Sequence, residues 1–211
     1  MTVILSAVNN EPLAIGAALS AKTLKNGGIG LSFTGDGGSN QGLTFEAINM
    51  AVVLKLPVIF VFENNGFGEG TAHDYAVGSK DIAGRAAGFG LPAEKVDGTD
   101  FFAVYEVAQK AIERARRGEG PSVIETVTNR FYGHFEGDPG LIRSKEELDY
   151  VKEHKDPLKI FREKVKDKID EAKLDAIDAQ SKANVGDAVA KARAAKYPEV
   201  SQLLTDVYVS Y

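Results

Sequence analysis

The chain has 211 residues, a length that fits one domain, or one domain with a short appendage. With 44% of its residues hydrophobic and 26% charged, its composition is typical of a soluble globular protein. The net charge of −5 and the lack of a basic stripe argue against nucleic-acid binding as the main function. The chain contains no cysteine, which excludes disulfides, thiolate zinc sites and cysteine nucleophiles.

The sequence offers no candidate for a membrane span, because no apolar run approaches the roughly 20 residues that a span needs. The opening segment 1–8 is apolar but lacks a basic region before it, so we do not expect a signal peptide. A cytoplasmic location is the expectation.

Helical and strand-like segments alternate through the first two-thirds of the chain. The expected helices are 11–25, 43–54, 81–89 and 101–117, and the expected strands are 29–34, 57–62, a weak one near 95–96, and 122–128. Strands separated by helices require crossover connections. The sequence therefore predicts an α/β fold, a parallel sheet with helices on both faces.

The composition changes near Ser144. Residues 145–196 are rich in Lys, Glu, Asp and Ala, which predicts solvated surface helices. The apolar tail 200–211 is expected to pack on this domain or on a partner. We therefore expect an α/β domain over 1–143 and a charged helical C-terminal region over 144–211.

Two of the predicted strands end in unusual polar clusters, 35–42 and 63–68. Asp-Gly and Asn-Gly pairs are ordinary in turns, so each cluster alone carries little functional information. The glycine-rich run 35–42 is not followed by the Gly-Lys-Ser/Thr of a P-loop, and its glycines do not have the dinucleotide-binding spacing. Glycines before a helix nevertheless allow a bulky anion to approach the backbone and the helix N-terminus.

Taken together, the two clusters predict a metal site. Asp36 and Asn65 are 29 positions apart, one after each of two strands joined by a helix. The ends of neighbouring parallel strands lie side by side, which allows the two side chains to converge. A carboxylate, an amide oxygen, a main-chain carbonyl and phosphate oxygens form the oxygen ligand set that magnesium prefers.

The same residues resemble a known motif. Gly35-Asp36-Gly37, 26 intervening residues and Asn64-Asn65 are similar to the thiamine diphosphate motif of transketolases, decarboxylases and 2-oxo acid dehydrogenases. The longer run 35–57 resembles most closely the alpha subunit of the heterotetrameric dehydrogenases. The similarity continues through 81–83, 96–98 and 118–121 and ends near 156–157, so it covers most of the chain. It implies the thiamine diphosphate-binding fold.

The resemblance also implies the site. The cofactor-binding residues that it implies are Gly35, Asp36, Gly37, Gly38, Asn65, Phe67, Arg130 and His134. Magnesium would be bound by the side chains of Asp36 and Asn65 and by the main-chain carbonyl of Phe67. Gly37 and Gly38 would bind the diphosphate through main-chain amides. No catalytic residue is assigned, because in this family the activating glutamate belongs to the beta subunit.

A loop after the last predicted strand adds two polar groups. Arg130 suits bidentate contact with phosphate, and His134 stands nearby as a further donor. A single His in such a place is more often structural, but the family's Arg and His at these positions contact the diphosphate. The run 132–138 resembles the acetoin dehydrogenase branch most closely. Phe135 stands where the mitochondrial pyruvate enzyme has a regulatory serine, so kinase control is not expected there.

The function implied by the resemblance is that of an alpha subunit, or its C-terminal part. The enzyme would be a thiamine diphosphate-dependent dehydrogenase acting on acetoin or a 2-oxo acid and passing the acyl unit to a lipoyl group. Expected partners are a beta subunit in an alpha2beta2 heterotetramer and a lipoyl-bearing acyltransferase. The residues alone do not choose among acetoin, pyruvate and branched 2-oxo acids.

The sequence also departs from the family. The substantial N-terminal segment of the family's alpha subunits is missing, so we expect a fragment or a split subunit whose other half is a separate chain. Glu11 lies where the family has a glycine-rich, apolar pattern near the aminopyrimidine ring. His73 and His154 are expected at the surface. Two alternatives stay open: a truncated, non-catalytic relative serving as a binding or assembly module, and the N-terminal part of a split transketolase.

Overall fold

The computed structural model describes residues 2–6 and 10–205, with side chains from residue 10 onward. The chain divides into two compact units, Met1–Phe161 and Arg162–Tyr211. We expected a domain boundary between residues 143 and 144, which is earlier in the chain than the division between residues 161 and 162. The expected domain boundary stays a prediction.

The first unit is built on a five-stranded sheet in the order β1-β2-β3-β7-β6, and every neighbouring pair is parallel. Its strands are β1 (Thr2–Ser6), β2 (Ile29–Gly35), β3 (Val58–Asn64), β6 (Ala93–Asp97) and β7 (Ser122–Val127). Strands β3 and β7 are apolar along most of their length and buried, as expected for central strands of a parallel sheet. The predicted parallel α/β fold is confirmed.

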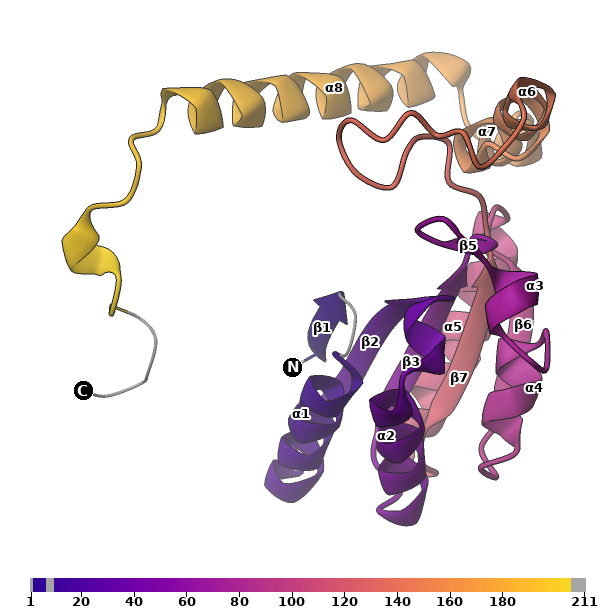
Figure 1. Ribbon diagram of the computed structural model, residues 1–211, viewed down its shortest axis with the longest axis vertical. Coiled ribbons are helices and arrows are strands. Elements are labelled where there is room, and N and C mark those ends of the chain that lie inside the picture. The colour runs from indigo at the N-terminus through magenta and orange to yellow at the C-terminus, as the bar shows by residue number, and fades with distance from the viewer. Residues whose placement is uncertain (1, 7–9, 206–211) are drawn as a thin grey trace. The chain divides into compact units, whose positions relative to one another are not determined.

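Helices cover both faces of this sheet (Figure 1). On one face α1 (Glu11–Leu24), α2 (Gly42–Val53) and α4 (Ile82–Ala87) pack with the sheet in one core, which contains Phe60 and Phe62. On the other face α5 (Phe101–Arg116) packs in a second core. Small residues on α1 and α2 let these helices approach the sheet closely. The two layers of helices leave the strand ends free at the edge where the polar clusters lie.

Local sequence signals explain where the longest helix of this unit begins and ends. The side chain of Asp100 accepts hydrogen bonds from the amides of Phe102 and Ala103, which caps the N-terminus of α5. Gly118 follows the helix with φ of +74°, a conformation that favours glycine and stops the helix. The predicted helix 101–117 therefore agrees with α5 within one residue at its C-terminal end.

Some elements were not predicted. Strand β1 lies within the apolar opening segment, for which no strand was expected; residues 1 and 7–9 of that region lie outside the described residues. A small antiparallel hairpin, β4 (Phe67–Gly68) and β5 (Thr71–Ala72), and the short helix α3 (His73–Ala76) occupy the loop after β3. The hairpin packs Gly68 against Gly37 at the end of β2, which bears directly on the site.

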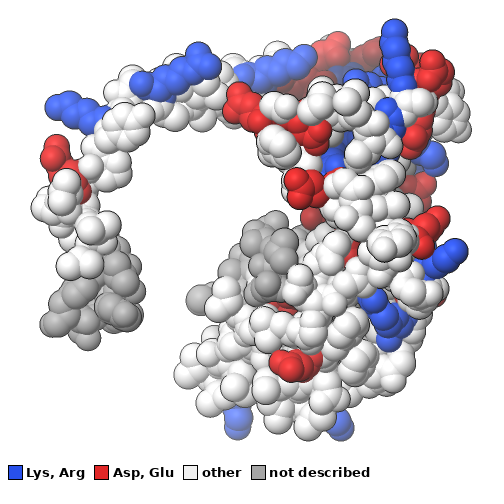
Figure 2. Space-filling model, viewed as in Figure 1, with Lys and Arg blue, Asp and Glu red and all other residues white. Residues whose placement is uncertain are grey.

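The C-terminal region is helical, as predicted. It contains α6 (Lys145–His154), α7 (Pro157–Val165) and α8 (Glu171–Ala194). The 24 residues of α8 all lie in the described part of the chain and none is buried. Figure 2 shows charged side chains of both signs along this helix.

The apolar tail 200–211 was expected to pack on this domain or on a partner. Val200, Leu203 and Leu204 in this tail are exposed, and residues 206–211 lie outside the described range. Docking of the tail therefore stays a prediction.

No helix in the described ranges 2–6 and 10–205 combines the length and the apolar character needed to cross a membrane.

Candidate functional site

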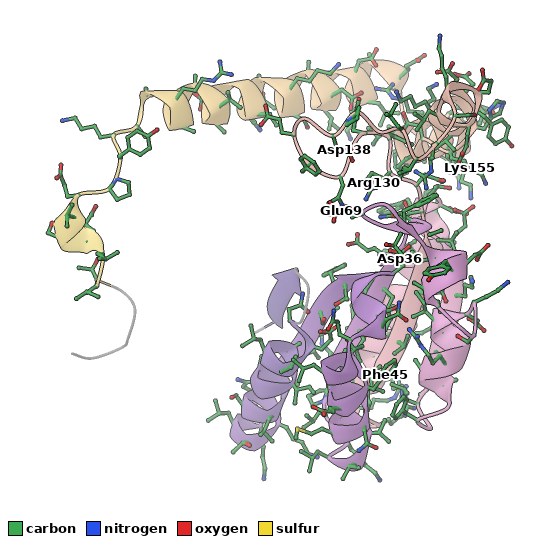
Figure 3. The ribbon with its side chains drawn as sticks, viewed as in Figure 1. Asp36, Phe45, Glu69, Arg130, Asp138 and Lys155 are labelled. Atoms are coloured by element: carbon green, nitrogen blue, oxygen red, sulfur yellow. The ribbon has the colours of Figure 1, made fainter. Side chains whose placement is uncertain are left out.

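The polar clusters meet at the carboxyl ends of three neighbouring strands. In the sheet register Gly35 at the end of β2 lies opposite Glu63 of β3, and Asn64 of β3 lies opposite Val127 of β7. The residues that follow these strands therefore leave the sheet at one edge, which is where ligands bind in open parallel sheets. In Figure 3 Asp36, Glu69 and Arg130 all lie on the side of the sheet where these strands end, with Asp36 nearest the sheet.

Asp36 is the buried acidic group of the site, with 2% of its surface exposed. Its Oδ1 accepts a hydrogen bond from the amide of Gly37 at 2.8 Å, whereas Oδ2 has no hydrogen-bond partner in the described structure. Burial raises the pKa of this carboxyl above its ordinary value, and the amides of Gly37 and Gly66 and the charges of His73 and Arg130 act in the opposite direction. The free oxygen is therefore placed to bind a cation.

The glycine-rich loop after Asp36 is packed tightly against the β4–β5 hairpin. A Cβ atom built on Gly68 would lie 2.9 Å from the Cα of Gly37, and one built on Gly37 would lie 3.1 Å from the Cα of Gly68. Neither glycine has a positive φ, so close approach of the two backbones is the reason for glycine at these positions. Gly38 opens the short 3-10 helix Gly38–Asn40.

A residue that the sequence analysis missed holds this loop from the other side. Arg85 on α4 donates from Nη1 to Oδ1 of Asn40 at 2.7 Å and from Nη2 to the carbonyl of Ser39 at 2.8 Å. Its guanidinium carbon also lies 5.0 Å from the centroid of the Phe45 ring. No sequence motif singled out Arg85, because its partners are 45 and 46 residues away.

The turn after β3 presents the second predicted group of ligands. The side-chain oxygen of Asn65 accepts a hydrogen bond from the amide of Phe67 at 3.1 Å. Gly66 between them has φ of +87°, which favours glycine. The carbonyl of Asn65 accepts a hydrogen bond from Arg143 at 2.6 Å, and the guanidinium of Arg143 lies over the Phe67 ring. The turn thus brings Asn65 and the backbone of Phe67 to the edge where Asp36 lies.

Glu125 on β7 holds the base of the same turn. It is fully buried; its Oε1 accepts from the side-chain amide of Asn64 at 2.8 Å, and its Oε2 accepts from the amide of Ala83 at 2.8 Å. Lys95 completes the arrangement with an ion pair of 3.1 Å. A buried carboxylate with all of these partners is a structural group rather than a free acid.

Arg130 and His134 lie in the loop that follows β7. Arg130 donates from Nη2 to the carbonyl of Glu69 in the β4–β5 turn at 3.0 Å. Its Nη1 lies 2.9 Å from Nδ1 of His134; since a guanidinium only donates, Nδ1 is the acceptor and the ring proton of a neutral His134 is on Nε2. Asp138 accepts from the amide of His134 at 2.7 Å. The predicted Arg–His pair is therefore held together, with the His Nε2 left as a donor.

The expectation that His73 is a surface residue is wrong. His73 is only 9% exposed, and it lines a cavity of about 210 Å³ together with Asp36, Gly37 and Gly68. Its Nε2 has no hydrogen-bond partner in the described part of the chain. The hairpin, which the sequence did not reveal, turns this side chain inward. His154, by contrast, is exposed, and its ring stacks on Tyr150.

Glu11, which was unexpected in the sequence, is also completely buried. Its Oε1 accepts hydrogen bonds from the hydroxyls of Thr34 at 2.7 Å and Thr44 at 3.1 Å, while Oε2 has no partner among the described residues. Asn10 beside it donates to the carbonyl of Phe33 at 2.8 Å. These polar groups attach the start of α1 to β2 and α2; the preceding residues 8 and 9 lie outside the described range.

Comparison with known proteins places this geometry in a family. Residues 1–201 match the family described as dehydrogenase E1 component, which is nearly the whole chain. The chain belongs to the dehydrogenase E1 component family. Enzymes of this family depend on thiamine diphosphate, and the resemblance derived from the sequence motifs is thereby confirmed.

Curated relatives of this E1 component chain carry related names. It is 50% identical over 202 residues to the alpha subunit of acetoin:2,6-dichlorophenolindophenol oxidoreductase from Cupriavidus necator, covering 95% of this chain and 61% of that protein. The alpha subunit of the same name from Bacillus subtilis is 46% identical, with 94% and 60% covered. The pyruvate dehydrogenase E1 component alpha subunit of Rhizobium meliloti is 37% identical, with 92% and 57% covered. The chain thus spans about three-fifths of the length of these relatives.

The residues of this E1 component chain fit a diphosphate held through a divalent cation. Among the described residues no group of three or more His, Cys, Asp and Glu side chains could hold a metal ion. Magnesium does not need such a group, because it is usually bound by one or two carboxylates together with phosphate oxygens and water. The unpartnered Oδ2 of Asp36 suits the cation, and the cavity lined by Asp36, Gly37 and Asn40 leaves room for the anion beside it.

Proposed function

We propose that this chain anchors the diphosphate of thiamine diphosphate through magnesium, in the alpha subunit of a dehydrogenase that acts on acetoin or a 2-oxo acid. The observation that carries the proposal is the buried Asp36 carboxylate with one unpartnered oxygen, at a strand end beside the Asn65–Phe67 turn. Burying an unpaired carboxylate is unfavourable unless a cation or a hydrogen-bond donor satisfies it. A bound magnesium ion is such a partner.

The proposed roles follow from the chemistry of each group. Asp36 and Asn65 would bind magnesium by their side chains and Phe67 by its carbonyl. The amide of Gly38, in the loop begun by Gly35, would donate to the diphosphate, as glycine-rich turns before a helix do. The amide of Gly37, which donates to Oδ1 of Asp36 in this structure, would do so when the carboxylate turns to the cation. These interactions bind and orient the anion and do not themselves carry out the chemical step.

The loop after β7 would complete the anion site. His134 can donate from Nε2, because its Nδ1 is used by Arg130. The positive charge of Arg130 already acts on Asp36, where it opposes the rise in pKa that burial causes, and it would also attract the diphosphate. When bound, thiamine diphosphate supplies the nucleophilic carbon and the electron sink for breaking a bond to a carbonyl carbon. No residue of this chain is assigned as the acid or base of that step.

The proposal includes partner chains. The names of the relatives as alpha subunits support a beta subunit as partner in an alpha2beta2 heterotetramer. That subunit would supply the activating glutamate, and a lipoyl-bearing acyltransferase would accept the acyl unit. A separate chain supplying the remaining part of an alpha subunit is a further expected partner. We place the complex in the cytoplasm, without nucleic acid or membrane contacts.

Dye reduction by the assembled enzyme tests this function. The chain is co-expressed with a beta-type partner, and reduction of 2,6-dichlorophenolindophenol is followed with acetoin, pyruvate or a branched 2-oxo acid. We expect reduction that requires thiamine diphosphate and magnesium, is fastest with acetoin, and falls at least about 100-fold in Asp36→Ala, since the cation loses its carboxylate ligand. Glu113→Ala, which removes an exposed acid of α5 outside the site, is the matched control and should keep the activity.

An inactive complex would have a defined meaning. If the assembled chains bind thiamine diphosphate but reduce no dye with any of the three substrates, the chain is the truncated binding module and the dehydrogenase proposal is wrong. Transfer of a two-carbon unit between sugar phosphates would instead support the split-transketolase alternative.

A further inference from the structure

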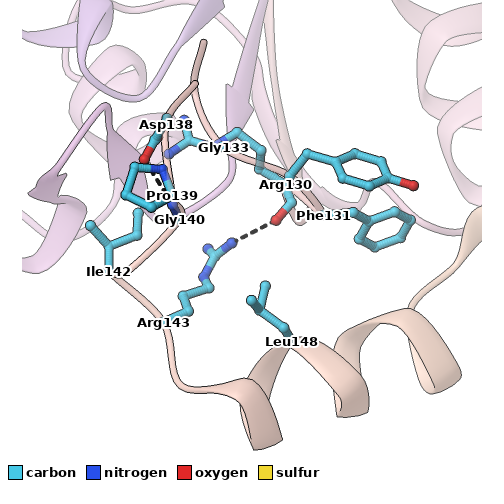
Figure 4. Close-up of a pocket in the computed structure, with 10 residues that line it drawn as sticks. Arg130, Phe131, Gly133, Asp138, Pro139, Gly140, Ile142, Arg143 and Leu148 are labelled. Carbon is cyan, nitrogen blue, oxygen red and sulfur yellow. Dashed lines mark hydrogen bonds between the residues drawn. The ribbon is translucent and has the colours of Figure 1, made fainter. Parts of the chain in front are cut away.

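Arg143 is a buried cation that no motif singled out. It lies between the loop after β7 and the start of α6, and its side chain is only 6% exposed. Its Nη1 donates to the carbonyl of Arg130 at 3.0 Å, and its Nη2 donates to the carbonyl of Asn65 at 2.6 Å. Figure 4 shows the guanidinium directed at the Arg130 carbonyl from across the pocket that these residues line.

Two further contacts fix the plane of this guanidinium. Its central carbon lies 4.9 Å from the centroid of the Phe67 ring, within the range of a cation–π interaction. Its Nε lies 3.1 Å from a carboxylate oxygen of Glu147 on α6. One side chain therefore contacts the turn after β3, the loop after β7 and the first turn of α6. The planar fork of arginine suits this geometry, whereas a lysine ammonium cannot reproduce it.

The segments joined by Arg143 are those that carry the two halves of the proposed site. The Asn65–Phe67 turn would supply magnesium ligands, and Arg130 with His134 would bind the diphosphate. Arg130 is itself attached to the β4–β5 turn through the carbonyl of Glu69. Since the guanidinium of Arg143 is turned to main-chain carbonyls and is shielded from solvent, it is suited to hold these segments rather than to bind a ligand.

We propose that Arg143 is a positioning residue that links the magnesium-binding turn to the diphosphate-binding loop, so that binding of the cation and binding of the anion reinforce each other. The coupling between cation binding and anion binding rests on the proposed function. The link between the two segments does not. Without the link, each segment can move independently, and ordering one by its ligand no longer orders the other.

Hydrogen exchange of the ligand-free full chain tests the link without reference to any cofactor. In Arg143→Lys we expect amides in the segments 64–73 and 130–140 to exchange at least about tenfold faster, with β2 and β3 unchanged. Arg117→Lys, which alters an exposed arginine paired with Glu119, is the matched control and should change neither segment. Faster exchange in only one of the two segments, or in neither, would overturn the link.

Calorimetry of the assembled protein tests the coupling. The measured quantity is the factor by which magnesium strengthens thiamine diphosphate binding. We expect this factor to fall at least about tenfold in Arg143→Ala, whereas loss of an arginine that only stabilises the fold would leave the factor unchanged. Arg143→Lys serves if the alanine variant does not fold. An unchanged factor contradicts the coupling. If the unaltered protein binds no thiamine diphosphate, the proposed function and the coupling fail, while the exchange experiment still decides the link.

Discussion

At the scale of single residues, Asp36 is a buried acid for which we propose a binding role. Its carboxyl is buried and its pKa is raised by that burial. The stability that the protonated group contributes is complete below the ordinary pKa of 3.8 and is lost as pH rises through the raised pKa. At neutral pH the buried charge therefore opposes folding of the ligand-free chain, and a bound cation would remove that opposition.

This reasoning predicts how ligand stabilisation depends on pH. With magnesium and thiamine diphosphate at about 100 times the dissociation constant, we expect roughly 2.7 kcal/mol of stabilisation near pH 8, or an increase of roughly 5 to 10 °C in the unfolding midpoint. The increase should shrink toward the lowest pH at which the chain stays folded, because protons compete with the cation for Asp36. Thermal unfolding measures it. An increase that is independent of pH, or one that survives in Asp36→Asn, would contradict this role.

A second prediction concerns Gly68. An added Cβ would lie 2.9 Å from the backbone of Gly37, so Gly68→Ala must push the hairpin away from the glycine-rich loop. We expect a loss of about 1–3 kcal/mol in stability and magnesium-dependent thiamine diphosphate binding at least about tenfold weaker. Gly70→Ala is the control, because a Cβ there meets nothing within 4 Å. Equal affinity in both variants would show that the close approach does not matter.

The sequence predicts some residues of the candidate site and not others for a physical reason. Asp36 and Asn65 follow apolar strands directly, so their place at the sheet edge follows from local pattern and from parallel topology. Arg143 contacts Asn65, which lies 78 residues earlier in the chain. His73 directly follows a hairpin that has only two residues in each strand, and this hairpin turns its side chain inward. Such contacts depend on the packed structure, and no local pattern encodes them.

At the scale of secondary-structure elements, Glu125 joins four of them. This buried side chain on β7 binds Asn64 of β3, the amide of Ala83 in α4 and Lys95 of β6. The interactions fix the end of β3, from which the Asn65 turn leaves. These interactions of Glu125 should therefore contribute to the free energy of unfolding of the chain.

We expect Glu125→Gln to lower the free energy of unfolding by about 1–3 kcal/mol, because its buried amide group would leave a donor without a partner, while the half-exposed Lys95 stays solvated. The glutamine would lack the charge that Lys95 pairs with and would set its NH2 group against another donor. Denaturant unfolding gives the value. Glu94→Gln, on the neighbouring strand β6 and half exposed, should stay within about 0.5 kcal/mol of the unaltered chain. Similar free energies of unfolding for the two variants would contradict the role of Glu125 in joining these elements.

The predictability of the elements follows their length and periodicity. The helices α1, α2 and α5 and the apolar strands β2, β3 and β7 were expected at nearly their observed bounds, whereas the helices of the C-terminal region were expected without bounds of their own. Strand β6 was expected only weakly, because Glu94 and Lys95 interrupt its apolar pattern. The hairpin β4–β5 has two residues in each strand, too few for any periodic signal, although it shapes the site.

At the scale of the whole molecule, the two compact units differ in how their side chains are buried. The first contains two hydrophobic cores, whereas α8 in the second buries no residue. An isolated helix of this kind gains little from packing and opens readily. The family match at residues 1–201 nevertheless includes it.

This difference predicts the order of proteolysis. Trypsin should cleave at Lys and Arg residues of α8 at least about tenfold faster than within the first unit, leaving a resistant fragment that retains the sheet. Mass spectrometry of the fragments over time measures the order. Cleavage inside α1 or α5 before cleavage inside α8 would contradict this difference between the two compact units. A partner chain that packs on α8 should slow its cleavage.

The central claim is that Asp36 anchors a diphosphate through magnesium, and calorimetry tests it most directly. The chain is isolated with its beta-type partner, and thiamine diphosphate binding is measured with and without magnesium, in the unaltered protein and in Asp36→Ala. We expect binding that requires magnesium and disappears in the variant. Binding that is indifferent to magnesium, equal in Asp36→Ala, or absent in a preparation that contains the partner would contradict it.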